Sequence, residues 1–175
     1  IFCNKIKNVN IIFFGNEESI KLSINKNNIN LSNYEIINTI DDVKDDDNAN
    51  TILRSRKESS IYKGLEYIKS QTDSGFVSAG NTAAIMILSR LQIGMIEGID
   101  RPAICSLIPN QKDYSIMLDL GANVNVTPTN LLQFAIMGYS YFCTIKNKDN
   151  PSIGILNIGT EYNKGLEVLK EASDL

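Results

Sequence analysis

Hydrophobic residues fall into two patterns that alternate along the chain: short continuous runs, and longer segments in which they recur every three or four positions. The short runs, typical of buried strands, span 9–14, 34–40, 75–78, 103–108, 114–118 and 152–158. The longer repeats, typical of helices, follow Asn16 and span 60–71, 82–93 and 128–145, with a last one from Lys164. This alternation predicts an α/β domain with a mostly parallel sheet. The polar turn after 103–108 indicates one hairpin.

Local signals define several of these helices. Asn16 stands before two glutamates, and Thr127 stands before a proline, so both residues are predicted N-caps. The segment 60–71 is amphipathic, whereas 82–93 is apolar nearly all round and is therefore predicted to be buried. The segment 128–145 has few polar residues, which predicts that it belongs to the core or to a subunit interface.

Composition excludes several classes of protein. A formal net charge of −3 argues against a nucleic-acid binder, whose domain usually has a basic face. The chain has no histidine, which excludes Ser-His-Asp and Cys-His catalysis and histidine-ligated metal sites within it. The cysteines, Cys3, Cys105 and Cys143, are widely spaced, which predicts reduced thiols in a cytoplasmic protein. No standard nucleotide motif occurs, so no cofactor is predicted, and only a magnesium site stays open.

No targeting or membrane segment is predicted. The longest uncharged apolar run, 83–88, is too short to cross a bilayer, and the amino terminus lacks the apolar region of a signal peptide. The first residue is Ile1 rather than Met. We therefore expect the chain to be a fragment or a processed product.

A cluster of small polar residues lies between the predicted strand 75–78 and the helix that follows it. Gly80 allows the backbone to turn, and Asn81 or Thr82 can cap the helix. Free N–H groups and the dipole at a helix start suit an anion such as phosphate, with Ser78 close by. Ordinary capping explains the same residues, and by itself the pattern favours that simpler interpretation.

Two further loops resemble this turn, because each follows an apolar run, contains glycine and supplies polar groups. They span 119–123 and 157–164. Ligand crevices of parallel α/β sheets lie outside the carboxyl ends of the strands, so we expect all three loops at one edge. Lys164 is the cation beside these loops; it is either an ordinary surface lysine or, since a helix start disfavours a cation, the partner of an anion.

The segment 51–57 is basic, with Arg54, Arg56 and Lys57. It faces either a phosphate or acidic partner, or only solvent, and the sequence leaves both open. The acidic connection 41–50 before it is better explained as a solvated loop than as a recognition patch.

Several ordered motifs resemble the phosphate acyltransferase (PlsX) family of bacterial phospholipid synthesis. They are Val-Ser-Ala-Gly-Asn-Thr at 77–82, Gly-Ile-Asp-Arg-Pro-Ala at 98–103, Leu-Asp-Leu-Gly-Ala-Asn-Val at 118–124, Gln-Phe-Ala-Ile-Met-Gly at 133–138 and Leu-Asn-Ile-Gly at 156–159. Arg54 with Ser59 and Ser60 fits a further element of the family. The resemblance runs from about residue 9 to the end.

The chain also departs from the family pattern. Ala83 replaces a usual glycine and adds only a methyl group, whereas Asn125 replaces an aspartate and removes a charge. The family's Asp-Ala-Met-Gly-Gly-Asp loop and its carboxy-terminal third have no counterpart here. We therefore expect residues 1–175 to form a single, incomplete α/β domain.

The resemblance implies a three-layer α/β/α Rossmann-like sandwich related to phosphotransacetylases and isocitrate-dehydrogenase-like enzymes. It implies transfer of a fatty acyl group from acyl carrier protein to inorganic phosphate by a cytoplasmic homodimer, with peripheral membrane contact through segments absent here. Two alternatives stay open: an acetyl- or butyryltransferase that uses coenzyme A thioesters, and a non-catalytic module that binds acyl carrier protein.

Inorganic phosphate is itself a nucleophile, so the protein needs only to orient it and to stabilise the oxyanion. The predicted phosphate and substrate ligands are Ser78, Gly80, Asn81, Thr82, Asp119 and Gly121. The predicted catalytic residues are Lys164 as a cation and Asn123 and Asn157 as amide donors. Asp119 is favoured as an organiser of its loop over a general base, and the predicted contacts to the carrier protein are Arg54, Arg56 and Lys57.

Overall fold

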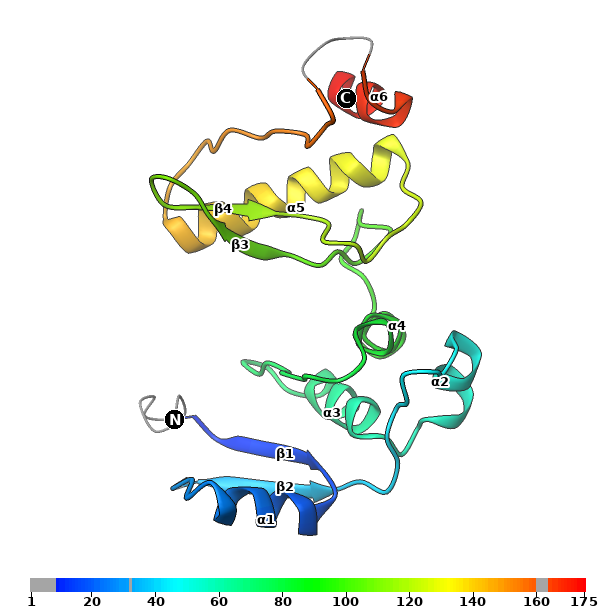
Figure 1. Cartoon of the computed structure of the whole chain (residues 1–175), viewed down its shortest axis with the longest axis vertical. Helices are drawn as coiled ribbons and strands as arrows, with labels where there is room; N and C mark the ends of the chain where they lie inside the picture. The colour runs from blue at the N-terminus through cyan, green and yellow to red at the C-terminus, as the bar shows by residue number, and fades with distance from the viewer. Residues whose placement is uncertain (1–8, 32, 160–163) are drawn as a thin grey trace. The chain divides into compact units, whose positions relative to one another are not determined.

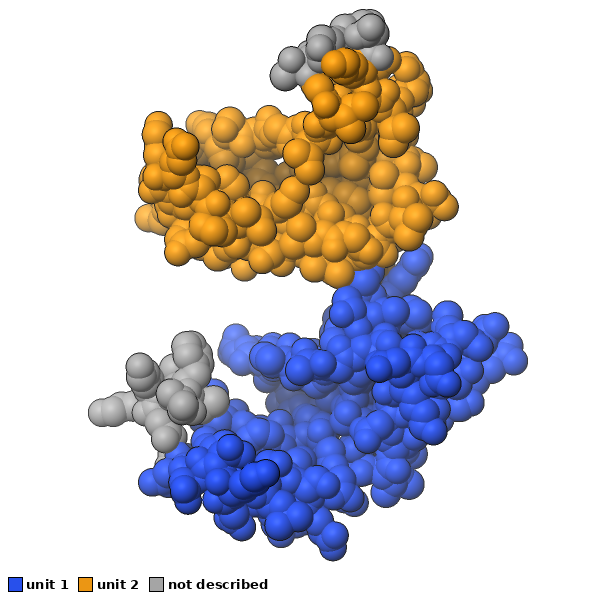
Figure 2. All heavy atoms as spheres, in the orientation of Figure 1, with its two compact units in different colours: residues 1–94 blue, residues 95–175 orange. Residues whose placement is uncertain are grey.

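The computed structural model describes residues 9–31, 33–159 and 164–175. Cys3 and part of the predicted loop 157–164 lie outside these residues. The chain divides into two compact units, unit 1 with Ile1–Gly94 and unit 2 with Met95–Leu175 (Figure 2). Each unit contains both helices and strands, and each is described separately below.

Unit 1 begins with a parallel pair of strands (Figure 1). Its elements are β1 (Ile11–Gly15), α1 (Glu17–Lys26), β2 (Tyr34–Asn38), α2 (Ala49–Ser55), α3 (Ser60–Lys69) and α4 (Thr82–Gln92). The register pairs Ile11 with Tyr34 and Gly15 with Asn38. Helices α1 and α3 both contact β1, and the rings of Phe14 and Tyr67 lie 5.7 Å apart.

Short polar side chains start the helices of unit 1. Asn16, Asn48, Ser59 and Asn81 each accept a hydrogen bond from a backbone N–H in the first turn of α1, α2, α3 and α4, respectively. Each bond satisfies one of the donors that a helix start leaves without an internal partner. The predicted cap at Asn16 is therefore confirmed.

Helices α2, α3 and α4 share one hydrophobic core. Its buried members are Ile52, Ile61, Leu65, Ala84 and Leu88. The amphipathic pattern predicted for 60–71 is confirmed, because its apolar residues are buried or packed against this core. The core therefore fixes the start of α4 against α3.

Unit 2 combines an antiparallel hairpin with a long helix. Its elements are β3 (Ser106–Pro109), β4 (Tyr114–Met117), α5 (Pro128–Lys146) and α6 (Glu167–Asp174). The hairpin prediction is confirmed, with Ser106 opposite Met117. Thr127 and Asn130 form reciprocal hydrogen bonds at the start of α5, which confirms the predicted cap. Helix α5 contacts both β4 and α6.

Two predicted strands are wrong in this structure, because 75–78 and 152–158 have no strand assignment. Both segments carry suitable apolar residues, but a strand also needs a neighbouring backbone to complete its hydrogen bonds, and neither segment belongs to a ladder. Some of their apolar side chains are open to solvent, with Val77 95% exposed and Ile158 85% exposed, whereas Phe76 packs against the core of unit 1.

Burial of the two apolar helices is only partial. Helix α4 buries Ala84 and Leu88, but Leu91 is exposed on its outer side, so the prediction of a fully buried helix is wrong. Helix α5 buries Phe134 and exposes Ile136. An apolar composition alone does not say which face finds a partner.

The α/β class is confirmed, since helices accompany a parallel strand pair. The three-layer sandwich and the single domain stay predictions. None of the helices within the described ranges is long and apolar enough to cross a membrane.

Candidate functional site

The turn 78–82 in unit 1 is held by its own side chains. The Ser78 hydroxyl accepts a hydrogen bond from the Gly80 N–H at 3.1 Å, and the Asn81 side chain accepts one from the Ala84 N–H at 2.9 Å. Gly80 packs closely: a Cβ there would lie 3.1 Å from a methyl group of Ile61 and 3.3 Å from the Ser78 hydroxyl. The turn therefore packs against Ile61 of the unit 1 core.

This turn presents a helix start to solvent. Thr82 is the first residue of α4, and Thr82 and Ala83 are exposed. The Asn81 cap accepts from the third N–H of the helix, so the N–H groups of Thr82 and Ala83 point outward from the first turn. With the helix dipole, such groups provide a favourable place for an anion.

In unit 2, Asp119 organises the loop 119–125. One carboxylate oxygen accepts from the Ile104 N–H at 2.8 Å, and the other accepts from the N–H of Asn123 at 2.7 Å and from its side-chain amide at 3.0 Å. Several donors thus already use both oxygens of Asp119. This is the arrangement expected of a loop organiser rather than of a general base. Gly121, with φ of +92°, supplies the left-handed turn of the loop.

The side chain of Asn123, which is predicted to be an amide donor to phosphate or the oxyanion, has acceptors within unit 2 in this structure. Its side-chain nitrogen donates to the Pro102 carbonyl at 2.9 Å and to Asp119 at 3.0 Å. A side-chain amide has two N–H donors, and both have acceptors here. Asn123 therefore ties the 119–125 loop to the preceding segment and has no donor left for phosphate or an oxyanion in this arrangement.

Two side chains that sequence reasoning missed support the same region. Gln133 on α5 is buried; its amide oxygen accepts from the Asp100 N–H at 3.1 Å, and its nitrogen donates to the Asp100 carboxylate at 2.9 Å. Arg101 donates to the Asn125 carbonyl at 2.9 Å. These bonds join the motif 98–103 to α5 and to the 119–125 loop. The two partners of each bond lie far apart in the sequence, so no local sequence pattern predicts that they meet.

The structure brings Asn157 and Lys164 together. The Asn157 amide donates to the Lys164 carbonyl at 3.4 Å and accepts from the Ile158 N–H at 2.8 Å. Gly165 follows with φ of +88°, and any side chain at this position would collide with the Asn157 amide. The positive φ favours glycine at this position, and the close packing places the Asn157 side chain beside the backbone of Lys164 and Gly165.

The predicted helix start at Lys164 is wrong, because α6 begins at Glu167. Gly165 has a left-handed backbone, which a right-handed helix excludes. Lys164 is exposed and lies before the helix. The dipole of α6 therefore gives no reason to expect an anion beside Lys164, and the role of Lys164 depends on its neighbours instead.

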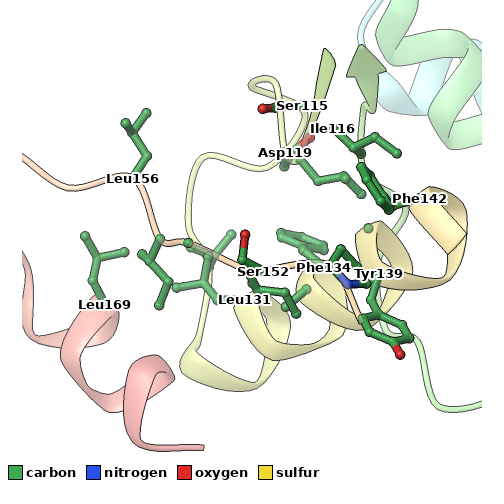
Figure 3. Close-up of a pocket in the computed structure, with 18 of the residues that line it drawn as sticks. Ser115, Ile116, Asp119, Leu131, Phe134, Tyr139, Phe142, Ser152, Leu156 and Leu169 are labelled. Atoms are coloured by element: carbon green, nitrogen blue, oxygen red, sulfur yellow. The ribbon is translucent and has the colours of Figure 1, made fainter. Parts of the chain in front are cut away.

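Two adjoining pockets lie in unit 2. The first, which we call the α5 pocket, has a volume of about 740 Å³ and lies between α5, β4 and the extended segment 151–156 (Figure 3). Asp119 and Asn123 also line it. The second, the Lys164 pocket, has a volume of about 690 Å³, and Asn157, Lys164 and Lys170 line it. Both volumes suit a small-molecule ligand.

Among the predicted carrier-contact residues, Arg56 binds carboxylates of its own unit. Its guanidinium contacts both carboxylate oxygens of Asp47, at 2.6 and 2.8 Å, and donates to Asp41 at 2.9 Å. These bonds lower the pKa of Asp47 to about 2 and raise the pKa of Arg56. Arg54 and Lys57 are exposed. The prediction of a carrier contact is therefore best kept for Arg54 and Lys57.

The structure leaves the predicted convergence of the three loops untested. The turn 78–82 belongs to unit 1, whereas the 119–123 loop, Asn157 and Lys164 belong to unit 2, so their convergence stays a prediction. Within the residues that the structure describes, no group of three or more acidic or cysteine side chains could hold a metal ion.

With this geometry in place, the chain can be compared with known proteins. The profile of a family described as "Fatty acid synthesis protein" matches residues 3–175. The chain belongs to this family. The resemblance that the sequence motifs indicated is therefore confirmed.

Three similar proteins are each named phosphate acyltransferase. A protein of Clostridium tetani named phosphate acyltransferase is 40% identical over 172 residues, which cover 98% of this chain and 52% of the relative. A phosphate acyltransferase of Ehrlichia ruminantium is 39% identical over 96% of this chain and 49% of its own length. One of Paraburkholderia phytofirmans is 46% identical over 74% of this chain and 35% of its own. The chain thus spans about half the length of most of the curated relatives that it matches.

Proposed function

We propose that this chain belongs to a phosphate acyltransferase, which transfers a fatty acyl group from acyl carrier protein to inorganic phosphate. The acyl-phosphate formed would serve phospholipid synthesis. The observation that carries this proposal is the family match over residues 3–175, with relatives named phosphate acyltransferase that are 37–46% identical. The loops and pockets of the structure are compatible with the chemistry that such a reaction needs.

In the proposed reaction, a phosphate oxygen attacks the carbonyl carbon of the thioester. A carbon–oxygen bond forms, a tetrahedral oxyanion follows, and the carbon–sulfur bond breaks as the carrier thiolate leaves and takes up a proton. Both phosphate and the oxyanion are negative, so the protein must supply positive charge and N–H donors. No covalent enzyme intermediate is required, because phosphate is itself the nucleophile.

We assign phosphate binding to the turn 78–82. The support is the helix start of α4, which presents the N–H groups of Thr82 and Ala83 while Asn81 and Ser78 hold the backbone in place. Helix starts bind anions through these groups and through the dipole. Gly80 is assigned the close packing that keeps the turn in this conformation.

We assign charge stabilisation to Lys164, with Asn157 as its positioning partner. Both line the Lys164 pocket, and the Asn157 amide contacts the Lys164 carbonyl. Asp119, with Asn123 and Gly121, is assigned the shape of the neighbouring loop rather than proton transfer. Arg54 and Lys57, both exposed, are assigned the acidic carrier protein.

The assignment of a homodimer, of the cytoplasm and of peripheral contact with the inner face of the membrane belongs to the same proposal. It rests on the family resemblance. Light scattering of the purified protein tests the dimer. Binding of anionic lipid vesicles by a full-length relative, such as the phosphate acyltransferase of Clostridium tetani, tests the membrane contact. A monomer, or a relative that ignores vesicles, would contradict this part and leave the proposed reaction intact.

The substitution Lys164→Met tests the proposed reaction at its cation. Acyl-phosphate is trapped with hydroxylamine as the acyl hydroxamate, with acyl carrier protein and coenzyme A thioesters compared as donors. Loss of one well-placed stabilising group typically costs about 100-fold or more in rate, and we expect a loss of this order. Lys148→Met is the matched control, because Lys148 is exposed in the same unit and lines neither pocket. Wild-type turnover by a folded Lys164→Met protein would remove the assignment.

A further inference from the structure

The α5 pocket is built from one face of α5. Its helical lining consists of Leu131, Phe134, Ala135, Gly138, Tyr139 and Phe142. These positions are spaced by three or four residues and therefore share one side of the helix. Figure 3 shows Leu156 and Leu169 toward one side of the view and Tyr139 and Phe142 toward the other, with Leu131 and Phe134 between them. From residue 131 to residue 142 the helix rises by about 16 Å, so the pocket is long.

The opposite walls combine apolar side chains with polar ones such as Ser115 and Ser152. Ile116 and Leu118 come from β4 and the residue after it, and Ile153 and Ile155 come from the extended segment. Ile153 is 58% exposed and Ile155 is 41% exposed, so these side chains face water in the empty pocket. A ligand that covered them would remove apolar surface from water, which is favourable.

The charges show which part of a ligand this pocket accepts. Among the described residues that line it, Asp119 alone carries a formal charge, and its oxygens already accept hydrogen bonds from Ile104 and Asn123. The pocket supplies no cation, and an anionic group placed here would lose its hydration without compensation. An uncharged, elongated body that is apolar where it meets α5 fits the lining.

The adjoining Lys164 pocket has the opposite character at one end. It shares Leu131, Ala135, Ile153, Ile155 and Leu169 with the α5 pocket, so the two pockets adjoin. It then adds the side chains of Lys164, Lys170 and Asn157, together with the acidic residue Asp174. A molecule with an apolar tail and a polar or anionic head would place the tail along α5 and the head beside Lys164.

We propose that the α5 pocket binds the hydrocarbon chain of a long-chain acyl group, with its carbonyl or acyl-phosphate end toward Lys164 and Asn157. This inference rests on the proposed function, since it names the part of the chain that holds the acyl substrate. Gly138 is then the residue that determines chain length. It lies on the pocket face, where a Cβ would stand 3.1 Å from a methyl group of Leu118. A larger side chain would block the space beyond it.

The test uses cis-parinaric acid, a fluorescent 18-carbon fatty acid, as the probe for the intact protein. We expect saturable binding that palmitate displaces and butyrate does not. Ile153→Asp places a charge in the pocket wall and should weaken binding by about tenfold or more. Ile158→Asp is the matched control, because Ile158 is exposed on the same segment and lines neither pocket. Equal affinities of the two variants would overturn the proposal.

Gly138→Leu supplies a second variant that favours helix formation and should therefore fold. It should weaken the binding of palmitate and leave that of octanoate unchanged, whereas Ile136→Asp, on the opposite side of α5, should change neither. If the face instead binds a second copy of the chain, Ile153→Asp would change the oligomeric state and leave probe affinity unchanged, which overturns the inference. Probe binding without phosphate-dependent acyl transfer would support the pocket and contradict only the proposed reaction.

Discussion

Arg56 and Asp47 form the strongest ionic contact among the described residues of unit 1. The guanidinium meets both oxygens of Asp47, and this pairing holds the acidic connection 41–47 against the end of α2. The contact lowers the pKa of Asp47 from 3.8 to about 2. Because the folded state holds this carboxylate ionised, its contribution to stability is present near neutral pH.

We expect this contribution to disappear as the pH falls from about 5 toward 2, since the unfolded chain takes up the proton more readily. Asp47→Asn should lower the urea midpoint at pH 6 and should flatten its dependence on pH below 5. Asp46→Asn, which removes an exposed carboxylate without such a contact, is the control and should follow the wild type. Parallel pH profiles for Asp47→Asn and wild type would contradict the assigned pairing.

For single residues, the sequence predicts which side chains matter but not the groups to which they bind. It favoured Asp119 as a loop organiser, and the hydrogen bonds to Ile104 and Asn123 fit that role. It also treated Arg56 as an exposed binding residue, whereas the side chain is occupied by two carboxylates. The partner Asp47 lies nine residues away, across a turn whose geometry the sequence does not specify.

The first turn of α4 is the element on which phosphate binding depends. Asn81→Ala removes the cap and should cost about 1 kcal/mol of stability. It should also raise the KM for phosphate by about threefold to tenfold, because the hydrogen bond that orders the first turn for phosphate is lost. Asn16→Ala removes the equivalent cap of α1, so it should cost similar stability and leave the KM for phosphate unchanged. Equal effects of both variants on KM would contradict the assignment.

The packing of α3 on the segment that leads to α4 depends on Gly64. A Cβ at this position would collide with the ring of Phe76. Gly→Ala in a helix usually stabilises by up to about 1 kcal/mol, but overpacking here should reverse the sign and cost about 1–3 kcal/mol.

A double-mutant cycle isolates this contact. Phe76→Leu should recover part of the loss caused by Gly64→Ala, because the smaller side chain makes room for the new methyl group. Urea unfolding of the two single variants and the double variant gives the coupling. Additive free energies would contradict a direct contact between Gly64 and Phe76.

Elements with local signals were predictable, and elements that need distant partners were not. The caps at Asn16 and Thr127 and the face of α3 follow from residues within one or two helical turns. The runs 75–78 and 152–158 have the composition of strands but no ladder. The left-handed backbone at Gly165 also moved the start of α6 past Lys164.

At the scale of the whole molecule, the α/β class and the family are established, and the activity is a proposal. The family match covers nearly the whole chain, whereas the chain covers about half of relatives such as the phosphate acyltransferase of Clostridium tetani. The motifs could identify the family because they are specific and ordered along the chain. The α5 pocket could not be predicted, since it depends on how β4, α5 and 151–156 meet.

Phosphate-dependent loss of the thioester tests the central claim most directly. The protein is incubated with palmitoyl acyl carrier protein, with and without inorganic phosphate, and the freed carrier thiol and the trapped acyl hydroxamate are both measured. We predict that both appear together, in equal amounts, only when phosphate is present. Thiol release that does not depend on phosphate, or no release by a protein that binds the carrier, would contradict it.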